Sequence, residues 1–97
     1  HGTGHGVGTY LNVHETPPSL SKYATEPLLE NMVVTNEPGF YLKNKFGIRI
    51  ENMMTVQKYK KDRFCFEMLT FIPFCDELID KEALTEDERV CRDIIVR

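Results

Sequence analysis

Residues 1–15 read HGTGHGVGTYLNVHE, and the rest of the chain is interpreted around them. All three histidines, His1, His5 and His14, lie in this segment, interleaved with four of the six glycines. Glycine lets backbone approach another group closely, and neutral imidazole is a common ligand for divalent metals. The segment therefore predicts a binding site rather than a solvated loop.

A Gly/His-rich start is also typical of a flexible tail or an expression-vector remnant. The residues that follow argue against that alternative, because strand-forming side chains stand between and after the glycines. These are Val7, Tyr10, Leu11 and Val13. We therefore expect His5 and His14 to be carried on ordered, partly buried backbone.

Composition limits the classes of protein to consider. The 97 residues form one domain at most, and the net charge of -3 gives no reason to expect nucleic acid as a partner. No apolar run approaches the roughly 18 residues of a membrane span, and no signal peptide opens the chain. The sequence predicts a soluble cytoplasmic protein with no membrane partner.

The cysteine count is odd and contains no C-x-x-C pair. Cys65, Cys75 and Cys91 therefore predict neither a disulfide framework nor a zinc knuckle. Reduced thiols in a cytosol-like compartment are the expected state, and we assign these cysteines no chemistry.

The middle of the chain predicts short strands separated by turns. The expected strands are Met32–Glu37, Phe40–Leu42, Phe46–Val56 and Phe64–Phe74. The expected connections are a proline-punctuated surface loop at Thr16–Ser21, a polar hairpin connection at Lys43–Lys45 and a charged turn at Gln57–Arg63.

A turn or short helix is expected within Leu78–Leu84, and a terminal helix is expected to start at Thr85. Thr85 can cap that helix, and an acidic first turn follows it. Val90, Ile94 and Ile95 can supply its apolar face. Several antiparallel strands with a C-terminal helix predict the α+β class.

Strand alternation places two charged side chains together. Successive side chains of a strand point to opposite faces, so Arg49 and Glu51 look the same way. If this strand pairs with the one that holds Glu37, two carboxylates and a guanidinium converge on one face. For an isolated Arg-x-Glu, a solvated face with a cross-strand ion pair is the commoner arrangement, and both interpretations stay open here.

Three separated strings carry a resemblance to a known family: HGTGHGVG followed by NVHE, then TNEPGFY, then GIRIEN. In this order and spacing they resemble the C-terminal half of the catalytic domain of the Xaa-Pro aminopeptidases. These dinuclear metallopeptidases have the pita-bread fold of prolidase, creatinase and methionine aminopeptidase. The strings LTFIPFCDELID and CRDII also resemble the tail of the cytosolic eukaryotic members.

The resemblance implies a partial pita-bread fold, mainly antiparallel sheet with a C-terminal helix. Residues 1–97 would form the C-terminal portion of one catalytic domain, truncated at its N-terminal side. It also implies His5, Glu37 and Glu51 as metal ligands, with Glu51 bridging two divalent ions. Carboxylates with one imidazole suit Mn²⁺, with Zn²⁺ and Co²⁺ as alternatives.

Five residues are implied to act around the metals. His1 and His14 resemble histidines that line the substrate site, and Glu37 is implied to accept the proton of the attacking water. Tyr41 and Arg49 resemble a pair that orients the ligands. The implied reaction is hydrolysis, by a hydroxide bridging the metals, of the bond between an N-terminal residue and a following proline.

The resemblance also sets limits. The family uses five protein ligands, and the other two are aspartates upstream of anything that resembles His1, so we expect the isolated chain to be inactive. A homodimer is implied for the full-length protein, and exposed Phe64, Phe66, Leu69 and Phe71 would favour self-association of this chain. Two alternatives stay open: a prolidase-type dipeptidase, and a non-catalytic pita-bread module that binds proteins or peptides.

Overall fold

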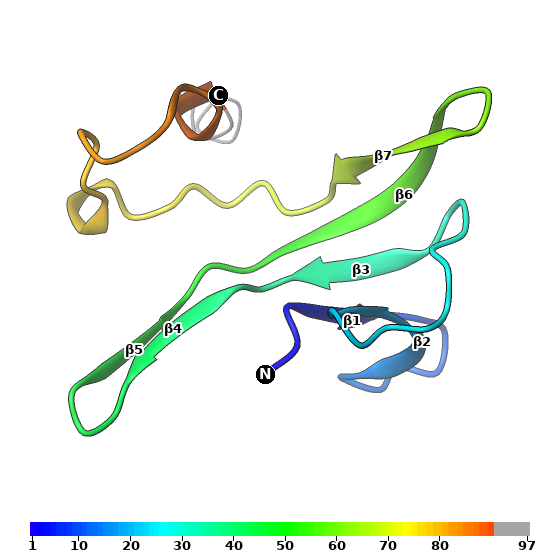
Figure 1. Cartoon of the computed structure of the whole chain (residues 1–97), viewed down its shortest axis with the longest axis horizontal. Coiled ribbons are helices and arrows are strands. Elements are labelled where there is room, and N and C mark those ends of the chain that lie inside the picture. The colour runs from blue at the N-terminus through cyan, green and yellow to red at the C-terminus, as the bar shows by residue number, and fades with distance from the viewer. Residues whose placement is uncertain (91–97) are drawn as a thin grey trace.

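The computed structural model describes residues 1–90, which form two antiparallel sheets (Figure 1). The strands are β1 (Gly4–Gly6), β2 (Glu15–Leu20), β3 (Val33–Asn36), β4 (Gly39–Leu42), β5 (Phe46–Arg49), β6 (Asn52–Lys60) and β7 (Arg63–Met68). A short 3-10 helix, η1 (Asp76–Leu78), follows them. The larger sheet has the order β2-β1-β3-β6-β7, and β4 and β5 form the smaller one.

One long hairpin ribbon runs through both sheets. In Figure 1, β3 continues into β4 and β5 continues into β6, along one diagonal of the molecule. The register is the same on both sides of the junction, where Asn36 pairs with Asn52 and Gly39 pairs with Arg49. The two sheets are therefore two halves of a single hairpin.

The ribbon is interrupted at residues 37–38 and 50–51, so the single strand predicted over Phe46–Val56 is in fact two. Pro38 has no backbone N–H and cannot donate to a strand ladder. Its carbonyl oxygen still accepts the N–H of Ile50 at 3.2 Å, which holds the two halves in register across the interruption.

The expectation of a surface loop at Thr16–Ser21 is wrong, because this segment forms most of β2. Prolines disfavour central strands, but β2 lies at the edge of the sheet, where one side of the strand needs no ladder partner. Pro17 and Pro18, each preceded by a cis peptide bond, are accommodated there. Ser19 pairs with His5 across the β1–β2 ladder.

The charged turn predicted over Gln57–Arg63 is much shorter than expected. β6 extends to Lys60 and β7 begins at Arg63, so only two residues connect the strands, and Asp62 adopts a left-handed φ of 63°. The charged side chains lie on exposed positions of a paired strand. The run of charged residues therefore belongs mainly to solvent-exposed strands and not to a loop.

Few apolar side chains are fully buried. Among residues 1–90 these are Val34 on β3 and Val56 on β6. Exposed large apolar side chains include Phe64, Phe66, Leu69 and Phe71, the four named from the sequence. Self-association through them stays a prediction. In the described part of the chain no helix is long and apolar enough to cross a membrane.

The β4–β5 half of the ribbon is exposed at every position. Its large apolar side chains are Phe40, Tyr41, Leu42, Phe46 and Ile48. β7 ends at Met68, and the predicted continuation to Phe74 runs as irregular backbone. Cys65 and Cys75 are free, exposed thiols, and Cys91 lies outside the described residues.

The predicted terminal helix begins at Glu86, where the described helical residues start. Thr85 and Glu88 form a reciprocal cap: the Thr85 N–H donates to Glu88 Oε2 at 2.8 Å, and the Glu88 N–H donates to Thr85 Oγ1 at 3.4 Å. Ile94 and Ile95, proposed for its apolar face, lie outside the described residues.

The cap makes this helical start pH-dependent. Hydrogen bonds from the backbone and then the side chain of Thr85 lower the pKa of Glu88. A lowered folded-state pKa stabilises the helix above the unfolded-state pKa, and this contribution is lost as the pH falls through the folded-state value. We expect NMR titration to show a lowered Glu88 pKa that Thr85→Ala returns to the ordinary value. An unchanged Glu88 titration in Thr85→Ala contradicts the cap.

Candidate metal centre

The interruption of the ribbon places two carboxylates opposite each other. Glu37 follows β3 and Glu51 precedes β6, and the common register sets Glu37 across from Glu51. Cross-strand partners project to the same face of a sheet. Glu37 is buried and Glu51 is exposed, so one carboxylate of the pair is shielded from solvent and the other is open to it.

His5 reaches the carboxylates from β1, the neighbour of β3 in the sheet. The N–H of His5 donates to Thr35 Oγ1 at 3.0 Å. The N–H of Glu37 donates to the carbonyl oxygen of Thr3 at 2.7 Å. These bonds fix the two chain segments to each other, and His5 Nε2 lies 3.1 Å from Glu37 Oε1.

The hydrogen bond of the other ring nitrogen decides how His5 can act. Nδ1 lies 2.8 Å from the carbonyl oxygen of Gly6, which only accepts, so Nδ1 carries a proton. When the ring is neutral, Nε2 presents its lone pair toward the carboxylate of Glu37. Two facing electron-pair donors fit a shared cation, and a backbone bond at Nδ1 is the usual way to orient a metal-binding imidazole.

Arg49 supplies part of the positive charge that the carboxylates require. Its Nε lies 3.7 Å from Glu37 Oε2 and 3.4 Å from Glu51 Oε2. The half-exposed guanidinium offsets one of the two negative charges when His5 is neutral. The face therefore carries a net negative charge, which favours a divalent cation.

The donor set fits a transition-metal site. One ligand atom from each of His5, Glu37 and Glu51 lies within 4.8 Å of the others. Within residues 1–90 this is the one such cluster of histidine, cysteine and carboxylate side chains. Carboxylate oxygens with a single imidazole are the ligand types expected for Mn²⁺ and related ions. The residues implied as ligands by the motifs are therefore the residues that converge.

Thr35 connects two members of the cluster. Its buried hydroxyl accepts from the His5 N–H and donates to Glu37 Oε1 at 3.0 Å. Valine keeps the shape but removes both bonds, so in Thr35→Val we expect the affinity for Mn²⁺ to fall about 10- to 100-fold. Titration monitored by electron paramagnetic resonance measures the affinity. Thr55→Val, a buried threonine on β6, is the matched control, and an equal loss in both variants contradicts the assignment.

The two remaining histidines occupy different positions. The ring of His14 packs edge-on against the ring of His5, with centroids 4.3 Å apart, although His14 itself is exposed. His1 Nε2 lies 2.7 Å from the hydroxyl oxygen of Tyr41, and His1 Nδ1 contacts the Gly2 carbonyl oxygen. Tyr41 thus contacts His1, whereas Arg49 contacts the carboxylates.

The backbone that carries His14 differs from the expectation. Residues 9–14 lie outside the strands, in a turn, irregular backbone and a bend. The side chains predicted to order them, Tyr10, Leu11 and Val13, are exposed. Sequence reasoning also missed Thr35. The signal was available, since Thr35 and Glu37 are two residues apart in the predicted strand Met32–Glu37 and therefore share a face.

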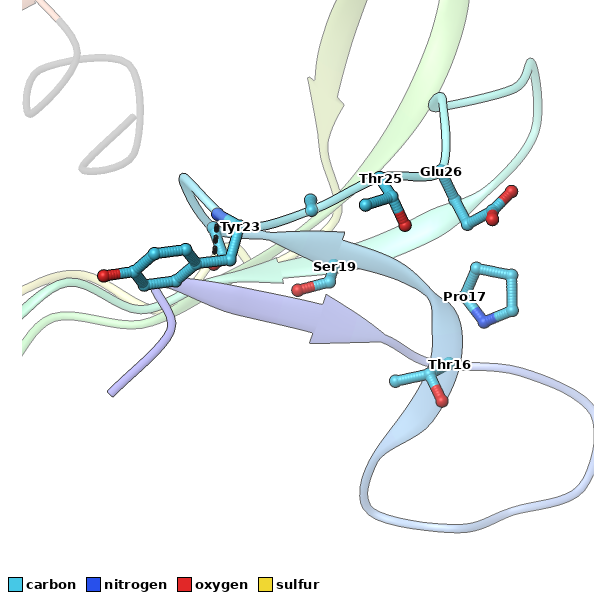
Figure 2. Close-up of a pocket in the computed structure, with 8 residues that line it drawn as sticks. Thr16, Pro17, Ser19, Tyr23, Thr25 and Glu26 are labelled. Atoms are coloured by element: carbon cyan, nitrogen blue, oxygen red, sulfur yellow. Dashed lines mark hydrogen bonds between the residues drawn. The ribbon is translucent and has the colours of Figure 1, made fainter.

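A separate hollow is lined by residues of β2 and of the segment that follows it. Figure 2 shows its lining, which includes Thr16, Pro17, Ser19, Tyr23, Thr25 and Glu26. Its volume is about 420 Å³, and Glu26 is its one carboxylate. The lining contains none of the residues that the motifs single out.

Comparisons with known proteins agree with the motifs and the geometry. The model of metallopeptidase family M24 matches residues 1–58. Described as "Probable Xaa-Pro aminopeptidase P", a protein from Metarhizium acridum is 46% identical over 92% of this chain. A protein of the same description from Pyrenophora teres is 48% identical over 92% of the chain. This chain spans 16% and 15% of the lengths of these two relatives.

A solved structure confirms the fold class. X-prolyl aminopeptidase from Caenorhabditis elegans, described as a cytosolic enzyme with a di-nuclear active site, superposes with a TM-score of 0.83. It is 40% identical, and the match covers 98% of this chain and 16% of that one. The resemblance to Xaa-Pro aminopeptidases and the partial pita-bread fold are thereby confirmed. The chain belongs to metallopeptidase family M24.

Proposed function

We propose that residues 1–97 are the C-terminal portion of one pita-bread catalytic domain, in a protein that removes the N-terminal residue from peptides with proline second. The observation that carries this proposal is the convergence of His5, Glu37 and Glu51 on one face. The names of the relatives and the di-nuclear site of the C. elegans enzyme support it. The exposed apolar ribbon of β4 and β5 is also what a portion of a larger domain would leave uncovered.

In this proposal His5, Glu37 and Glu51 contribute to a site for two divalent ions, with Mn²⁺ preferred and Zn²⁺ or Co²⁺ as alternatives. Bound there, the ions would supply Lewis acidity and activate water at neutral pH. The chain orients its ligands through the Gly6 carbonyl oxygen on His5, the Thr35 hydroxyl on Glu37 and the Arg49 guanidinium between the carboxylates.

The side chains near the ligands have separable roles. Glu37 accepts the proton of the attacking water, since its carboxylate lies at the centre of the cluster. Within residues 1–90 the ring of His14 makes no hydrogen bond, so its nitrogens are open to the peptide and to the tetrahedral intermediate. Both ring nitrogens of His1 contact groups of this chain, so Tyr41 sets the orientation in which His1 meets the peptide.

The proposal extends to cellular context. We place the protein in the cytoplasm, in keeping with the cytosolic enzyme from C. elegans. We also propose a homodimer for the full-length protein. Exposed apolar side chains on β7, Phe64 and Phe66, are available for such contacts.

The decisive experiment compares the 97-residue chain with the longer protein that contains it. We expect the longer protein to cleave Arg-Pro-Pro in the presence of Mn²⁺, to lose activity on chelation, and to cleave Arg-Ala-Ala poorly. The isolated chain, with three of the five implied ligands, should not cleave either peptide. Activity that survives chelation contradicts the metal centre, and equal cleavage of both peptides contradicts the proline specificity.

A further inference from the structure

The loop between β1 and β2 carries His14 and has little apolar packing of its own. Its start is fixed where the Val7 N–H donates to the Val33 carbonyl oxygen at 3.0 Å. Beyond that point the side chains face solvent, and Leu11 is 91% exposed. Leu11 also has a φ of 61°, a conformation that a leucine adopts only when its surroundings impose it. Polar contacts must therefore hold this loop.

The carboxylate of Glu15 supplies such contacts. Its Oε1 accepts the backbone N–H of Tyr10 at 3.3 Å, and its Oε2 accepts the N–H of Asn12 at 3.1 Å. Glu15 is the first residue of β2, so the carboxylate is attached to the sheet and reaches back into the loop. Hydrogen bonds to an ionised acceptor are stronger than those between neutral groups. The loop is therefore held on both sides of Leu11.

The glycine at position 8 makes room for this arrangement. A Cβ at Gly8 would lie 2.6 Å from Glu15 Oε1, closer than real contacts allow, and 3.2 Å from its Cδ. Gly8 of the opening motif therefore has a structural role that does not involve His5. It lets the Glu15 carboxylate approach the loop backbone.

We propose that Glu15 is a positioning residue for His14. By closing the loop, it sets the ring of His14 against the ring of His5, with centroids 4.3 Å apart. Within residues 1–90 the His14 ring makes no hydrogen bond or ion pair, so this ring contact is the polar or aromatic interaction that fixes it. The expected effect of changing Glu15 on peptide hydrolysis rests on the proposed function of His14. The expected effect on the position of the His14 ring does not depend on that function, and the two effects are measured separately.

The first measurement is the nuclear Overhauser effect between the ring protons of His14 and His5. We expect it in the unmodified chain and expect it to weaken strongly in Glu15→Gln, which replaces one acceptor oxygen by an amide donor. Gly8→Ala should do the same, because its Cβ displaces the carboxylate. Thr9→Ala, an exposed change in the same loop, should leave the signal intact. An unchanged signal in both Glu15→Gln and Gly8→Ala, with circular dichroism unchanged, overturns the proposal.

The second measurement uses hydrolysis by the longer protein. We expect Glu15→Gln to lower kcat about 10- to 100-fold with little change in KM, because a catalytic group is misplaced while peptide binding persists. Combined with His14→Ala, it should add nothing, since both changes remove the same contribution. Additive losses overturn the positioning role. If the unmodified protein cleaves no Xaa-Pro peptide, the proposed function fails, and the ring-contact measurement still decides the role of Glu15.

Discussion

Replacing Glu37 with glutamine is expected to abolish Mn²⁺ binding at the cluster and to lower peptide hydrolysis by the longer protein at least about 10²-fold. Glu37 lies at the centre of the site, 3.1 Å from His5 Nε2 and 3.7 Å from Arg49 Nε. Glutamine still accepts the hydroxyl of Thr35, so the fold should persist. It removes the negative charge that a metal ligand and a proton acceptor both require.

The matched control for this change is Glu67→Gln, an exposed carboxylate on β7 in the same sheet. Affinity measured by calorimetric titration of Mn²⁺, and kcat on Arg-Pro-Pro, should stay at the unmodified level in the control. Far-UV circular dichroism should coincide for both variants. Retention of Mn²⁺ affinity in Glu37→Gln would remove this residue from the metal centre.

Replacing Gly4 with alanine is expected to destabilise the fold by about 3 kcal/mol or more, at the upper end of what overpacking costs. A Cβ at Gly4 would lie 2.0 Å from the Thr35 carbonyl oxygen and 2.9 Å from Leu20 Cδ1. Backbone cannot yield as a flexible side chain does, so β1 must move away from β3. This motion also separates His5, which is carried by β1, from Glu37, which follows β3.

Gly2→Ala is the control for Gly4→Ala, because its Cβ would make ordinary contacts of 3.8 Å and 3.9 Å. Urea unfolding followed by circular dichroism measures the difference in the free energy of unfolding. Most folded domains are stable by about 5–15 kcal/mol, so the loss predicted for Gly4→Ala is a large share of the total. Equal stability of the two variants contradicts the tight packing of β1 against β3.

The convergence of the carboxylates could be predicted from strand parity. The alternation of Arg49 and Glu51 placed both on one face, and pairing with the strand that ends near Glu37 brought the second carboxylate to it. The register that sets Glu37 across from Glu51 is a property of the whole hairpin. Strand alternation alone predicts that Arg49 and Glu51 share a face. The pairing of the two strands determines that Glu37 lies opposite them.

Two predictions of secondary structure failed because local composition does not indicate where a segment lies in the sheet. Proline excludes Pro17 and Pro18 from central strands, and nothing in the local sequence says that β2 is an edge. The charged residues up to Lys60 resemble a turn, yet they extend β6 on its solvated face. In both cases long-range pairing overrode the local preference.

The Gly/His-rich segment was ordered for a reason other than the one expected. Its apolar residues, Leu11 among them, do not pack in the described structure. Order comes from the backbone bonds of β1 and from the Glu15 carboxylate, which a search for apolar periodicity does not detect. The same holds for Thr35, whose hydroxyl matters because of the two ligands it touches.

The measurement that tests the central claim most directly is an NMR titration of the chain with Mn²⁺, in which paramagnetic broadening locates the ion. The account predicts that the amide signals of His5, Glu37 and Glu51 broaden first, and that Glu37→Gln removes this selectivity. Broadening that is strongest instead along the exposed acidic segment at residues 76–88, and that is the same in Glu37→Gln, would contradict a metal centre at the cluster.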